Sequence, residues 1–460
     1  MNISLITQFP EFENEYVDVV NAFSPYVKLD ENGLKIQILR ENLDDSCKIS
    51  IKYGDFHNTQ TLKLTNDLIV DKRYLKRISK TLLYQALTNL TNVSLPWGSL
   101  TGIRPTKLAR ELGGAKFLQE DFFVSLDKAK LVDDILANQG NIVDDNPKNV
   151  DIYVNIPFCV SRCSYCSFIS AIYDQKKKLM KDYTKALAKE IEATIQIISN
   201  KSLNLRSIYV GGGTPTSLSA DEMYDALYPL TKVNNVEFTI EAGRPDTINV
   251  EKLEVIKSVG ASRISVNPQT FNKKTLDLIG RRHSVEDIYT AYDIVKRYDL
   301  SINMDLIASL PGETYQDFVN SLTCAIDLCP DDITVHTLAI KRSSSMSLDG
   351  YDNTSDVASM MVEYSLNTLQ NAGYKPYYLY RQKHMSGNLE NVGYTRSKPV
   401  IYNIDNMEEC SSILANGAGG ISKNCLFGKN RIERISNAKN IEEYLRRIDE
   451  IIEKKIDFFS

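Results

Sequence analysis

Apolar and polar residues repeat with two different periods along this chain, and the change of period predicts its parts. In the first third, three short segments alternate at every second residue, which is typical of half-buried antiparallel strands. These segments are residues 34–40, 46–53 and 59–64. Residues 71–92 then repeat apolar side chains at helical spacing. The next segment is predicted to be a rigid turn around Trp97, although its basic residues could instead meet an anion. Together these elements predict an N-terminal α+β accessory domain over residues 1–147, which ends in a polar linker.

From residue 150 onward the pattern becomes strand, loop and helix, repeated along the chain. The predicted strands are residues 151–156, 206–210, 236–241, 263–267, 301–307 and 332–338. The main amphipathic helices between them are predicted at residues 178–199, 220–232, 285–298 and 315–328. Ser219 and Glu222 match a capping box that opens the second of these helices. Such alternation predicts an α/β fold of parallel βα units, in which chemistry gathers at the carboxyl ends of the strands.

The composition of the 460 residues is that of a globular protein, with 43% hydrophobic residues, 25% charged residues and a net charge of −5. This length allows one large core and one or two smaller domains. The sequence has no basic arm of the kind that binds nucleic acid. No apolar run reaches the ~18 residues of a membrane span, and the first basic residue, Lys28, comes too late for a signal peptide. We therefore expect a cytoplasmic protein whose eight cysteines are reduced.

Three cysteines lie within eight residues, directly after the first strand of the repeating pattern. Cys159, Cys163 and Cys166 do not form the two separated pairs of a structural zinc site. They also do not match the four-cysteine runs of electron-transfer ferredoxins. Three thiolates on a four-iron cluster leave one iron open for a substrate or cofactor. A zinc site, disulfides or a chance grouping are the alternatives, and the motifs downstream favour the cluster.

Polar residues and glycines stand at the carboxyl ends of the later strands. The motif Gly211-Gly-Gly-Thr-Pro-Thr216 follows the second strand, where glycines allow the backbone to approach a ligand closely. Glu241 ends the third predicted strand, Gln269 follows the fourth, and Asp305 lies in the fifth. Gly280-Arg-Arg-His283 lies between the fourth and fifth strands. Taken singly, each is typical of a cap, a turn or a salt bridge. Together they place two carboxylates, an amide and a guanidinium at one edge, and a zwitterionic nucleoside needs such groups.

These residues resemble the oxygen-independent coproporphyrinogen III oxidase (dehydrogenase) family of radical S-adenosylmethionine (SAM) enzymes, over residues 150–425. The resemblance rests on Tyr153-Val-Asn-Ile-Pro-Phe-Cys159, the three cysteines, the glycine motif, Gly280-Arg-Arg-His283 and Asp305-Leu-Ile-Ala-Ser-Leu-Pro-Gly312. Residues 96–107 and 381–394 are similar to its HemZ-type branch. The resemblance implies a partial (β/α)6 TIM-like barrel as the radical SAM core over residues 148–375. A C-terminal substrate-side segment over residues 376–460 is expected to follow.

The resemblance also implies the cofactors and their ligands. A 4Fe–4S cluster is expected on Cys159, Cys163 and Cys166, with SAM beside it. The residues expected to contact SAM are Tyr153, Tyr165, Gly211, Gly212, Gly213, Thr214, Glu241, Gln269, Arg281 and Asp305. Arg282 is the alternative to Arg281 for the arginine that binds the SAM carboxylate. A reducing partner such as flavodoxin or ferredoxin is expected to supply the electrons.

The activity that the resemblance implies is the oxidative decarboxylation of coproporphyrinogen III to protoporphyrinogen IX without oxygen, on a tetrapyrrole or another small-molecule substrate. The four propionates of this substrate need cations. Residues that could supply them are Lys341, Arg342, Arg381, Lys383 and Arg396. His336 and His384 could exchange protons with the macrocycle, or they could be packed or surface histidines.

Three departures from the family pattern concern the substrate side or the strand ends. Asn155 replaces a histidine before Ile-Pro-Phe-Cys, Phe168 replaces a further cysteine, and Ser309 replaces a glycine. Two other functions therefore stay open. One is a haem carrier, whose His-Asn-x-x-Tyr-Trp motif corresponds to residues 402–407, where only Asn403 is kept. The other is a radical SAM methyltransferase on the same scaffold.

Overall fold

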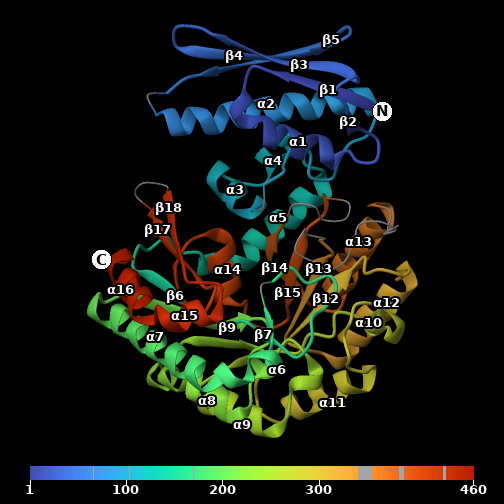
Figure 1. The fold of residues 1–460 in the computed structure, drawn as a ribbon. Helices are drawn as coiled ribbons and strands as arrows, with labels where there is room; N and C mark the ends of the chain where they lie inside the picture. Colours follow the sequence, from blue (N-terminus) through green and yellow to red (C-terminus); the bar gives the residue numbers. More distant parts are fainter. Residues whose placement is uncertain are drawn as a thin grey trace. The chain divides into compact units, whose positions relative to one another are not determined.

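The computed structural model describes residues 1–65, 67–102, 104–168, 170–339, 355–382, 388–427 and 431–459. They form two compact units (Figure 1). The first unit is Met1–Asp133 with short pieces from residues 381–389, and the second contains the remainder of the chain. The boundary lies inside helix α5 (Leu126–Gln139), before the expected linker. The division into residues 1–147, 148–375 and 376–460 stays a prediction.

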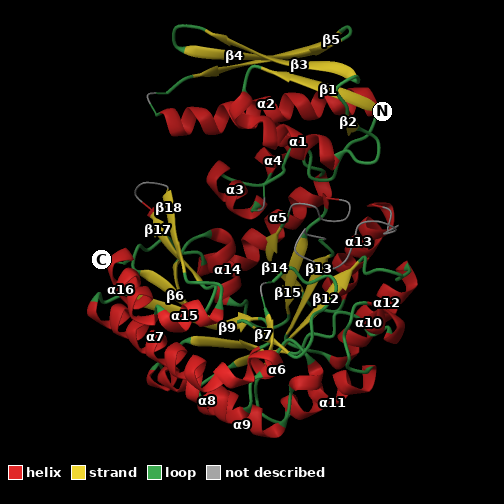
Figure 2. Cartoon of the chain, in the orientation of Figure 1, coloured by secondary structure: helices red, strands yellow, loops and turns green. Residues whose placement is uncertain are grey.

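The N-terminal unit is built on a five-stranded sheet with the order β2-β1-β3-β4-β5 (Figure 2). Its strands are β1 (Asn2–Thr7), β2 (Lys28–Leu29), β3 (Leu34–Asn42), β4 (Ser46–Tyr53) and β5 (Phe56–Lys63). Helix α2 (Leu68–Thr91) packs against β4 and β5, and α1 (Glu13–Ala22) packs against α2. The three predicted strands and the predicted helix are confirmed. The sequence pattern did not indicate β1 and β2, because β1 alternates weakly and β2 has two residues.

The turn around Trp97 is the rigid element that the sequence predicted. Trp97 is fully buried, and the Arg381 guanidinium lies 5.0 Å above its ring. Gly98 has a φ of +52°, and a Cβ there would lie 1.9 Å from the carbonyl oxygen of Phe122, so only glycine fits. Helix α3 (Pro105–Leu112) begins at a proline, whose fixed φ suits the first turn of a helix.

The second unit is built on one sheet of eleven strands. Seven neighbouring strands run parallel, in the order β16-β6-β9-β10-β11-β12-β13. They are β16 (Ser412–Asn416), β6 (Asn149–Ile156), β9 (Asn204–Gly212), β10 (Glu237–Glu241), β11 (Arg263–Ser265), β12 (Ser301–Ala308) and β13 (Asp332–Thr337). The six predicted strands and the α/β fold are therefore confirmed, and β16 is a seventh parallel strand from the C-terminal part of the chain.

Antiparallel strands extend this sheet at both edges. Strands β15 (Asn391–Thr395) and β14 (Lys375–Tyr380) follow β13, whereas β17 (Ile421–Leu426) and β18 (Arg431–Ser436) follow β16. The C-terminal segment, predicted as an extension, thus contributes to both edges of the sheet.

Helices cover the outer face of the sheet (Figures 1 and 2). The main helices of this outer layer are α7 (Met180–Asn200), α8 (Ala220–Leu227), α9 (Val250–Ser258), α11 (Val285–Lys296) and α12 (Tyr315–Leu328). The capping box of Ser219 and Glu222 is confirmed. Helix α8 is shorter than predicted, because Pro229 lacks the amide hydrogen that an α-helix needs and the chain continues as a 3-10 helix. No helix in the described ranges is long and apolar enough to cross a membrane.

A buried carboxylate on α7 ties the C-terminal helices to the turn after β16. The last two helices are α15 (Ile441–Arg446) and α16 (Ile448–Phe458). Glu190 accepts hydrogen bonds from Lys455 Nζ (2.6 Å), Tyr444 Oη (2.6 Å), Asn437 Nδ2 (2.8 Å) and the backbone nitrogen of Gly417 (2.8 Å). Lys455 and Glu190 are both buried. Four donors on one carboxylate satisfy this ion pair well, as a buried charge requires.

Candidate active site

The inner face of the sheet, opposite the outer helices, carries the predicted site. Side chains alternate along each strand, so residues two apart share this face. Tyr153 on β6 pairs with Tyr209 on β9, and Asp305 on β12 pairs with Thr334 on β13. Glu241, at the end of β10, lies on the same face, because its Oε2 would lie 2.8 Å from a Cβ on Gly211, two residues after Tyr209. The carboxyl ends of the parallel strands therefore gather the predicted polar residues, as expected for this fold.

The three cysteines lie on the loop that follows β6. Cys163 is buried, and Cys159 and Cys166 are partly exposed. The Cys166 amide donates a hydrogen bond to the Cys163 carbonyl oxygen at 3.1 Å, which closes a tight turn. Burial raises the pKa of the Cys166 thiol, and the nearby Cys163 and Cys159 raise it further. The loop thus brings the three thiols close together.

The alternatives for this loop can be compared with the geometry. All eight cysteines lie in the described ranges and are free thiols, so the loop forms no disulfide. Among the described residues, no three His, Cys, Asp or Glu side chains surround one point as ligands of a single metal ion. In a 4Fe–4S cluster each cysteine binds a different iron, so this type of site does not require donors that converge on one ion.

The glycine motif packs directly against the cysteine loop and the carboxylate at the end of β10. A Cβ on Gly213 would lie 2.4 Å from the Phe158 carbonyl oxygen and 2.9 Å from Cys159 Sγ. A Cβ on Gly211 would lie 2.8 Å from Glu241 Oε2. The next residue, Thr214, donates its amide hydrogen to the Phe158 carbonyl oxygen at 2.7 Å. Glycine is therefore required here because the loop and the strand approach each other closely.

Two carboxylates lie on the inner face near these glycines. Burial and the neighbouring Asp305 raise the pKa of Glu241 to about 8, although a hydrogen bond from the Tyr209 hydroxyl favours its ionised form. Asp305 accepts a hydrogen bond from Asn303 Nδ2 at 2.8 Å and lies 3.6 Å from His336 Nε2. Two acids this close together favour a ligand that carries positive charge.

Gln269 and Arg281 complete the polar edge. Gln269 has a φ of +68°, which is costly for a residue other than glycine. Its backbone nitrogen donates to the Asp305 carbonyl oxygen at 2.9 Å. The buried Arg281 guanidinium donates to the carbonyl oxygens of Asn267 (2.5 Å) and Gly243 (3.2 Å). Arg281 therefore points into the site, whereas the side chain of Arg282 is exposed. Of the two candidate arginines, the geometry favours the first.

Several polar atoms at this edge have no partner within the described part of the chain. They are Gln269 Oε1, Asn267 Oδ1 and Arg281 Nε, and all three are buried. Buried polar groups are normally hydrogen-bonded, so unpaired ones indicate a place for a ligand. Tyr165, on the cysteine loop, lies beside them, since Arg281 Nη2 donates to its hydroxyl at 3.4 Å. Unpaired acceptors and an unpaired donor thus lie on the loops that follow β11 and α10, beside the cysteine loop.

Tyrosines form a wall of the inner face that the sequence analysis identified only at Tyr153. The Tyr209 and Tyr402 rings stack with centroids 4.5 Å apart, and Tyr153 stacks 6.2 Å from Tyr402. The hydroxyl oxygen of Tyr380 lies 3.1 Å from His336 Nδ1. Tyr209 and Tyr380 lie on strands, two residues from other inner-face positions, so the alternation could have indicated them. Tyr402 lies on helix α14 (Ile401–Glu408), and no local pattern indicates its position.

Asn155, one of the departures from the family pattern, holds the turn after β16. Its Nδ2 donates to the Ala418 carbonyl oxygen at 2.5 Å, and its Oδ1 accepts from the Tyr153 hydroxyl at 3.2 Å. A Cβ on Gly212 would lie 2.3 Å from that Oδ1, so Asn155 also fits closely against the glycine motif. The residue therefore links the C-terminal part of the sheet to the site.

Two of the cations suggested for the propionates, Arg381 and Arg396, lie within the described residues. The Arg381 guanidinium donates to the carbonyl oxygens of Leu100 (2.6 Å) and Asn388 (2.8 Å) within the N-terminal unit. Arg396 lies near the amino end of β13, where its amide donates to the Asp331 carbonyl oxygen and its guanidinium contacts Cys329 Sγ. For Arg396 the prediction is wrong, because Thr395 pairs with Asp332 and so places Arg396 at the amino ends of the strands, away from the predicted site. For Arg381 the role toward the propionates stays a prediction. The other candidates, Lys341, Arg342, Lys383 and His384, lie outside the described residues.

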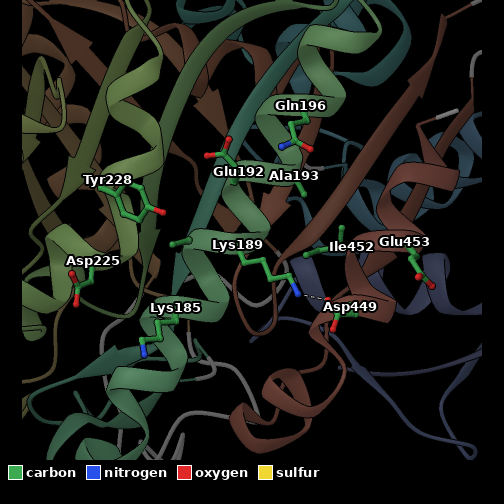
Figure 3. A pocket seen from close by; sticks show the side chains of 11 residues that line it. Lys185, Lys189, Glu192, Ala193, Gln196, Asp225, Tyr228, Asp449, Ile452 and Glu453 are labelled. Atoms are coloured by element: carbon green, nitrogen blue, oxygen red, sulfur yellow. Dashed lines mark hydrogen bonds and ion pairs between the residues drawn. The ribbon is translucent and has the colours of Figure 1, made fainter.

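A hollow on the outer helical layer is separate from this site (Figure 3). It lies between α7, α8 and α16, and it is lined by charged side chains such as Lys189, Asp449 and Glu192. Lys189 pairs with Asp449, and Glu192 accepts from Lys232 at 2.6 Å. None of the residues that line it is a predicted site residue, so it is not a candidate active site.

Comparison with known proteins agrees with this geometry. Residues 153–325 match the radical SAM superfamily. The chain is 36% identical to the oxygen-independent coproporphyrinogen-III oxidase-like protein HemZ of Bacillus subtilis, over 87% of this chain and 85% of that protein. It is 30% identical to the heme chaperone HemW of Haemophilus influenzae, over 65% of this chain and 76% of that protein.

Among solved structures, the fold is similar to that of coproporphyrinogen III oxidase (HemN) from Escherichia coli, a radical SAM enzyme. The TM-score is 0.51 at 21% identity, with 71% of this chain and 73% of that chain covered. The predicted radical SAM fold is therefore confirmed.

Proposed function

The chain belongs to the radical SAM family that contains the oxygen-independent coproporphyrinogen-III oxidase-like proteins, and from this we propose that it oxidatively decarboxylates coproporphyrinogen III to protoporphyrinogen IX in the cytoplasm. The observation that carries the proposal is the gathering of one cysteine loop, one glycine motif, two carboxylates and one buried guanidinium at a single strand edge. The likeness to HemZ supports the choice of substrate, since it extends over 87% of this chain.

Membership of this family implies a 4Fe–4S cluster and SAM, and the residues present fit both. Cys159, Cys163 and Cys166 would hold the cluster, on a loop whose thiols lie close together. The unpaired atoms of Gln269 and Arg281 provide an acceptor and a donor for a polar ligand. When bound, the reduced cluster and SAM supply a 5′-deoxyadenosyl radical that removes a hydrogen atom from an unactivated carbon.

The residues of this chain bind and orient the cofactor in the proposed reaction. Glu241 would accept from the SAM ammonium group, and Arg281 Nε would donate to its carboxylate. Asp305 and Gln269 would accept from the ribose hydroxyls. The glycine motif, Gly211–Gly213 with Thr214, leaves room for the cofactor beside Cys159, and Tyr165 closes the site from the loop.

Besides binding the cofactor, the site must exclude water, and the tyrosine wall would do this. Tyr153, Tyr209 and Tyr402 present stacked rings at the inner face. Apolar rings beside the reacting carbon protect it from side reactions with solvent. His336 lies between Asp305, 3.6 Å from its Nε2, and the Tyr380 hydroxyl, 3.1 Å from its Nδ1, and so would fix the position of that hydroxyl. A protein such as flavodoxin or ferredoxin supplies the electron that reduces the cluster.

A haem carrier is the second candidate, because HemW of Haemophilus influenzae, a heme chaperone, matches 65% of this chain. The residues that correspond to the haem motif argue against it here. They lie on α14, where Tyr402 stacks on Tyr209 and Asn403 Nδ2 donates to the Tyr377 hydroxyl at 3.0 Å. Side chains engaged in packing are not presented to a haem iron. We therefore favour the oxidase.

A product assay tests the proposed function. Anaerobic protein with a reconstituted cluster, dithionite, SAM, coproporphyrinogen III and an electron acceptor is expected to form protoporphyrinogen IX. Each of two propionates loses one hydrogen atom, one carbon dioxide and one electron, so two 5′-deoxyadenosines accompany each product. Mass spectrometry of the oxidised porphyrins measures the loss of two carbon dioxide molecules, and chromatography measures 5′-deoxyadenosine.

The same assay separates the alternatives. Haem that binds without any turnover of SAM would replace the oxidase with a carrier. A porphyrin or other acceptor that gains a methyl group would indicate a methyltransferase. Formation of 5′-deoxyadenosine without a vinyl product would contradict the proposed substrate.

SAM binding is expected to depend on pH through Glu241, whose pKa is raised to about 8 in the ligand-free protein. Below this pH the carboxyl is mostly protonated, while the SAM ammonium favours the ionised form, so binding releases a proton. The Kd should therefore fall as the pH rises toward 8, by up to about tenfold per pH unit. Glu241→Gln should abolish this slope. It should also weaken binding at pH 8.5 by about ten- to a hundredfold, through loss of a charged hydrogen bond.

Isothermal titration with SAM between pH 6.5 and 8.5 measures both effects. The matched control is Glu237→Gln, the same change at the amino end of the same strand, where the carboxylate accepts from the Tyr402 amide. Iron content should be normal in both variants. An unchanged Kd and slope in Glu241→Gln would place the SAM ammonium elsewhere.

A further inference from the structure

We infer that the surface directly outside the cysteine loop is the docking site of a small acidic protein that carries one electron at a time. This inference rests on the proposed function, because it supplies the electron that the reaction consumes. The surface is defined here by Arg162 on the cysteine loop, Arg282 on the loop after α10 (Lys273–Leu278), and Lys177 and Lys178 before α7, and it is called the basic surface.

The cysteine loop and the loop after α10 lie against each other beneath this surface. The Ser164 amide donates to the Ile279 carbonyl oxygen at 3.0 Å. A Cβ on Gly280 would lie 3.4 Å from the Arg162 carbonyl oxygen. A hollow opens between the two loops, and it is lined by residues 160–162 on one side and 280–282 on the other. The two exposed arginines therefore flank one recess.

The charge around the recess is predominantly positive, although the whole chain has a net charge of −5. Arg162, Arg282, Lys177 and Lys178 all have exposed side chains. Gln175 also lines the recess. The half-exposed Lys176 separates it from Lys177 and Lys178 along the chain. The acids nearby are Asp174, Asp277 and Glu442, of which Asp277 pairs with Lys273 and Glu442 with Lys176. A local positive field of this kind attracts and orients an acidic protein.

The position of this surface suits electron transfer rather than catalysis. Arg162 directly precedes Cys163, a proposed cluster ligand, so a protein docked on the basic surface would contact the loop that holds the cluster. Of the residues proposed to contact SAM whose side chains ionise, only Arg281 lines the recess, whereas Glu241 and Asp305 do not. In the transfer, the reduced carrier loses one electron and the cluster gains it, and no atom moves. A contact limited to a few loops fits the small, short-lived interfaces of electron-transfer proteins.

The test uses charge reversal and two kinds of reductant. Arg162→Glu/Arg282→Glu in the cluster-loaded protein is expected to raise the Kd for oxidised flavodoxin at least tenfold at low ionic strength. It should also reduce the dependence of binding on salt. Fluorescence anisotropy of labelled flavodoxin measures the Kd without any turnover. Formation of 5′-deoxyadenosine with reduced flavodoxin should slow in parallel, whereas formation with dithionite should not change.

Two further variants keep the result interpretable. Lys177→Glu/Lys178→Glu lies outside the cysteine loop and should also weaken flavodoxin binding, even if Arg162→Glu perturbs that loop. Lys375→Glu is the matched control, since this exposed lysine begins β14 at the opposite end of the strands. Wild-type affinity in both double variants would overturn the docking site and leave the proposed function intact. A wild-type protein that binds flavodoxin through the basic surface, but never cleaves SAM with dithionite, would instead overturn the proposed function.

Discussion

Replacing any one of Cys159, Cys163 and Cys166 with alanine is expected to abolish SAM cleavage and to remove most of the iron. Reconstituted wild-type protein should hold about four irons per chain and absorb near 400 nm, as 4Fe–4S proteins do. The loss should be nearly complete, because only three protein thiolates hold the proposed cluster and two cannot retain it. Iron analysis, the visible spectrum and 5′-deoxyadenosine formation measure the effect.

Cys410→Ala is the matched control for this series. Cys410 is also buried, but its thiol donates to Asp405 Oδ1 at 3.1 Å, and burial raises its pKa well above the usual range. A thiol that resists ionisation is a poor cluster ligand. The variant should keep its iron and its activity. If iron were lost equally from Cys410→Ala, the three-cysteine assignment would be wrong.

Lys455→Met is expected to destabilise the protein by about 3–5 kcal/mol, since it leaves the Glu190 carboxylate buried without its counter-charge. Burial lowers the pKa of Lys455, which shows that the amine itself is costly to ionise there without Glu190. Urea denaturation followed by circular dichroism measures the change. The Tyr444, Asn437 and Gly417 donors remain in the variant, so the site loses charge balance rather than every hydrogen bond.

The neighbouring exposed residue provides a control on the same helix. Lys454→Met removes an amine from α16 at the surface, and its effect should stay within about 0.5 kcal/mol. The double variant Glu190→Gln/Lys455→Met should recover part of the lost stability, because it removes both charges. Equal destabilisation by Lys454→Met and Lys455→Met would show that the buried ion pair does not account for the effect.

The elements that the sequence predicted well are those with a local signal. Strands such as 151–156 and 301–307 show their apolar pattern within a few residues, and the Ser219 capping box depends on residues three apart. The candidate site was predictable for the same reason, because Glu241 and Asp305 lie at or near the carboxyl ends of such strands. Their roles toward SAM stay predictions.

The elements that the sequence did not predict depend on contacts between distant parts of the chain. Strand β16 is a short, fully buried run, and only its pairing with β6, more than 250 residues earlier, makes it part of the sheet. The place of Tyr402 in the tyrosine wall follows from how α14 packs, which its own sequence does not reveal. Arg396 was misassigned because its place at the amino ends of the strands follows from the pairing of β15 with β13, about 60 residues earlier, which its own segment does not reveal.

The pairing of β16 with β6 also sets an order of events during synthesis. Strand β6 emerges from the ribosome long before residues 412–416, so one side of the strand that leads into the cysteine loop stays an open edge for most of translation. An open edge of this kind can pair with other chains and aggregate. Asn155, at the end of β6, has no Ala418 to hold until the same late residues arrive. Insertion of the cluster should therefore be a post-translational event, and slow or interrupted synthesis should lower the yield of iron-loaded protein more than the yield of the N-terminal unit.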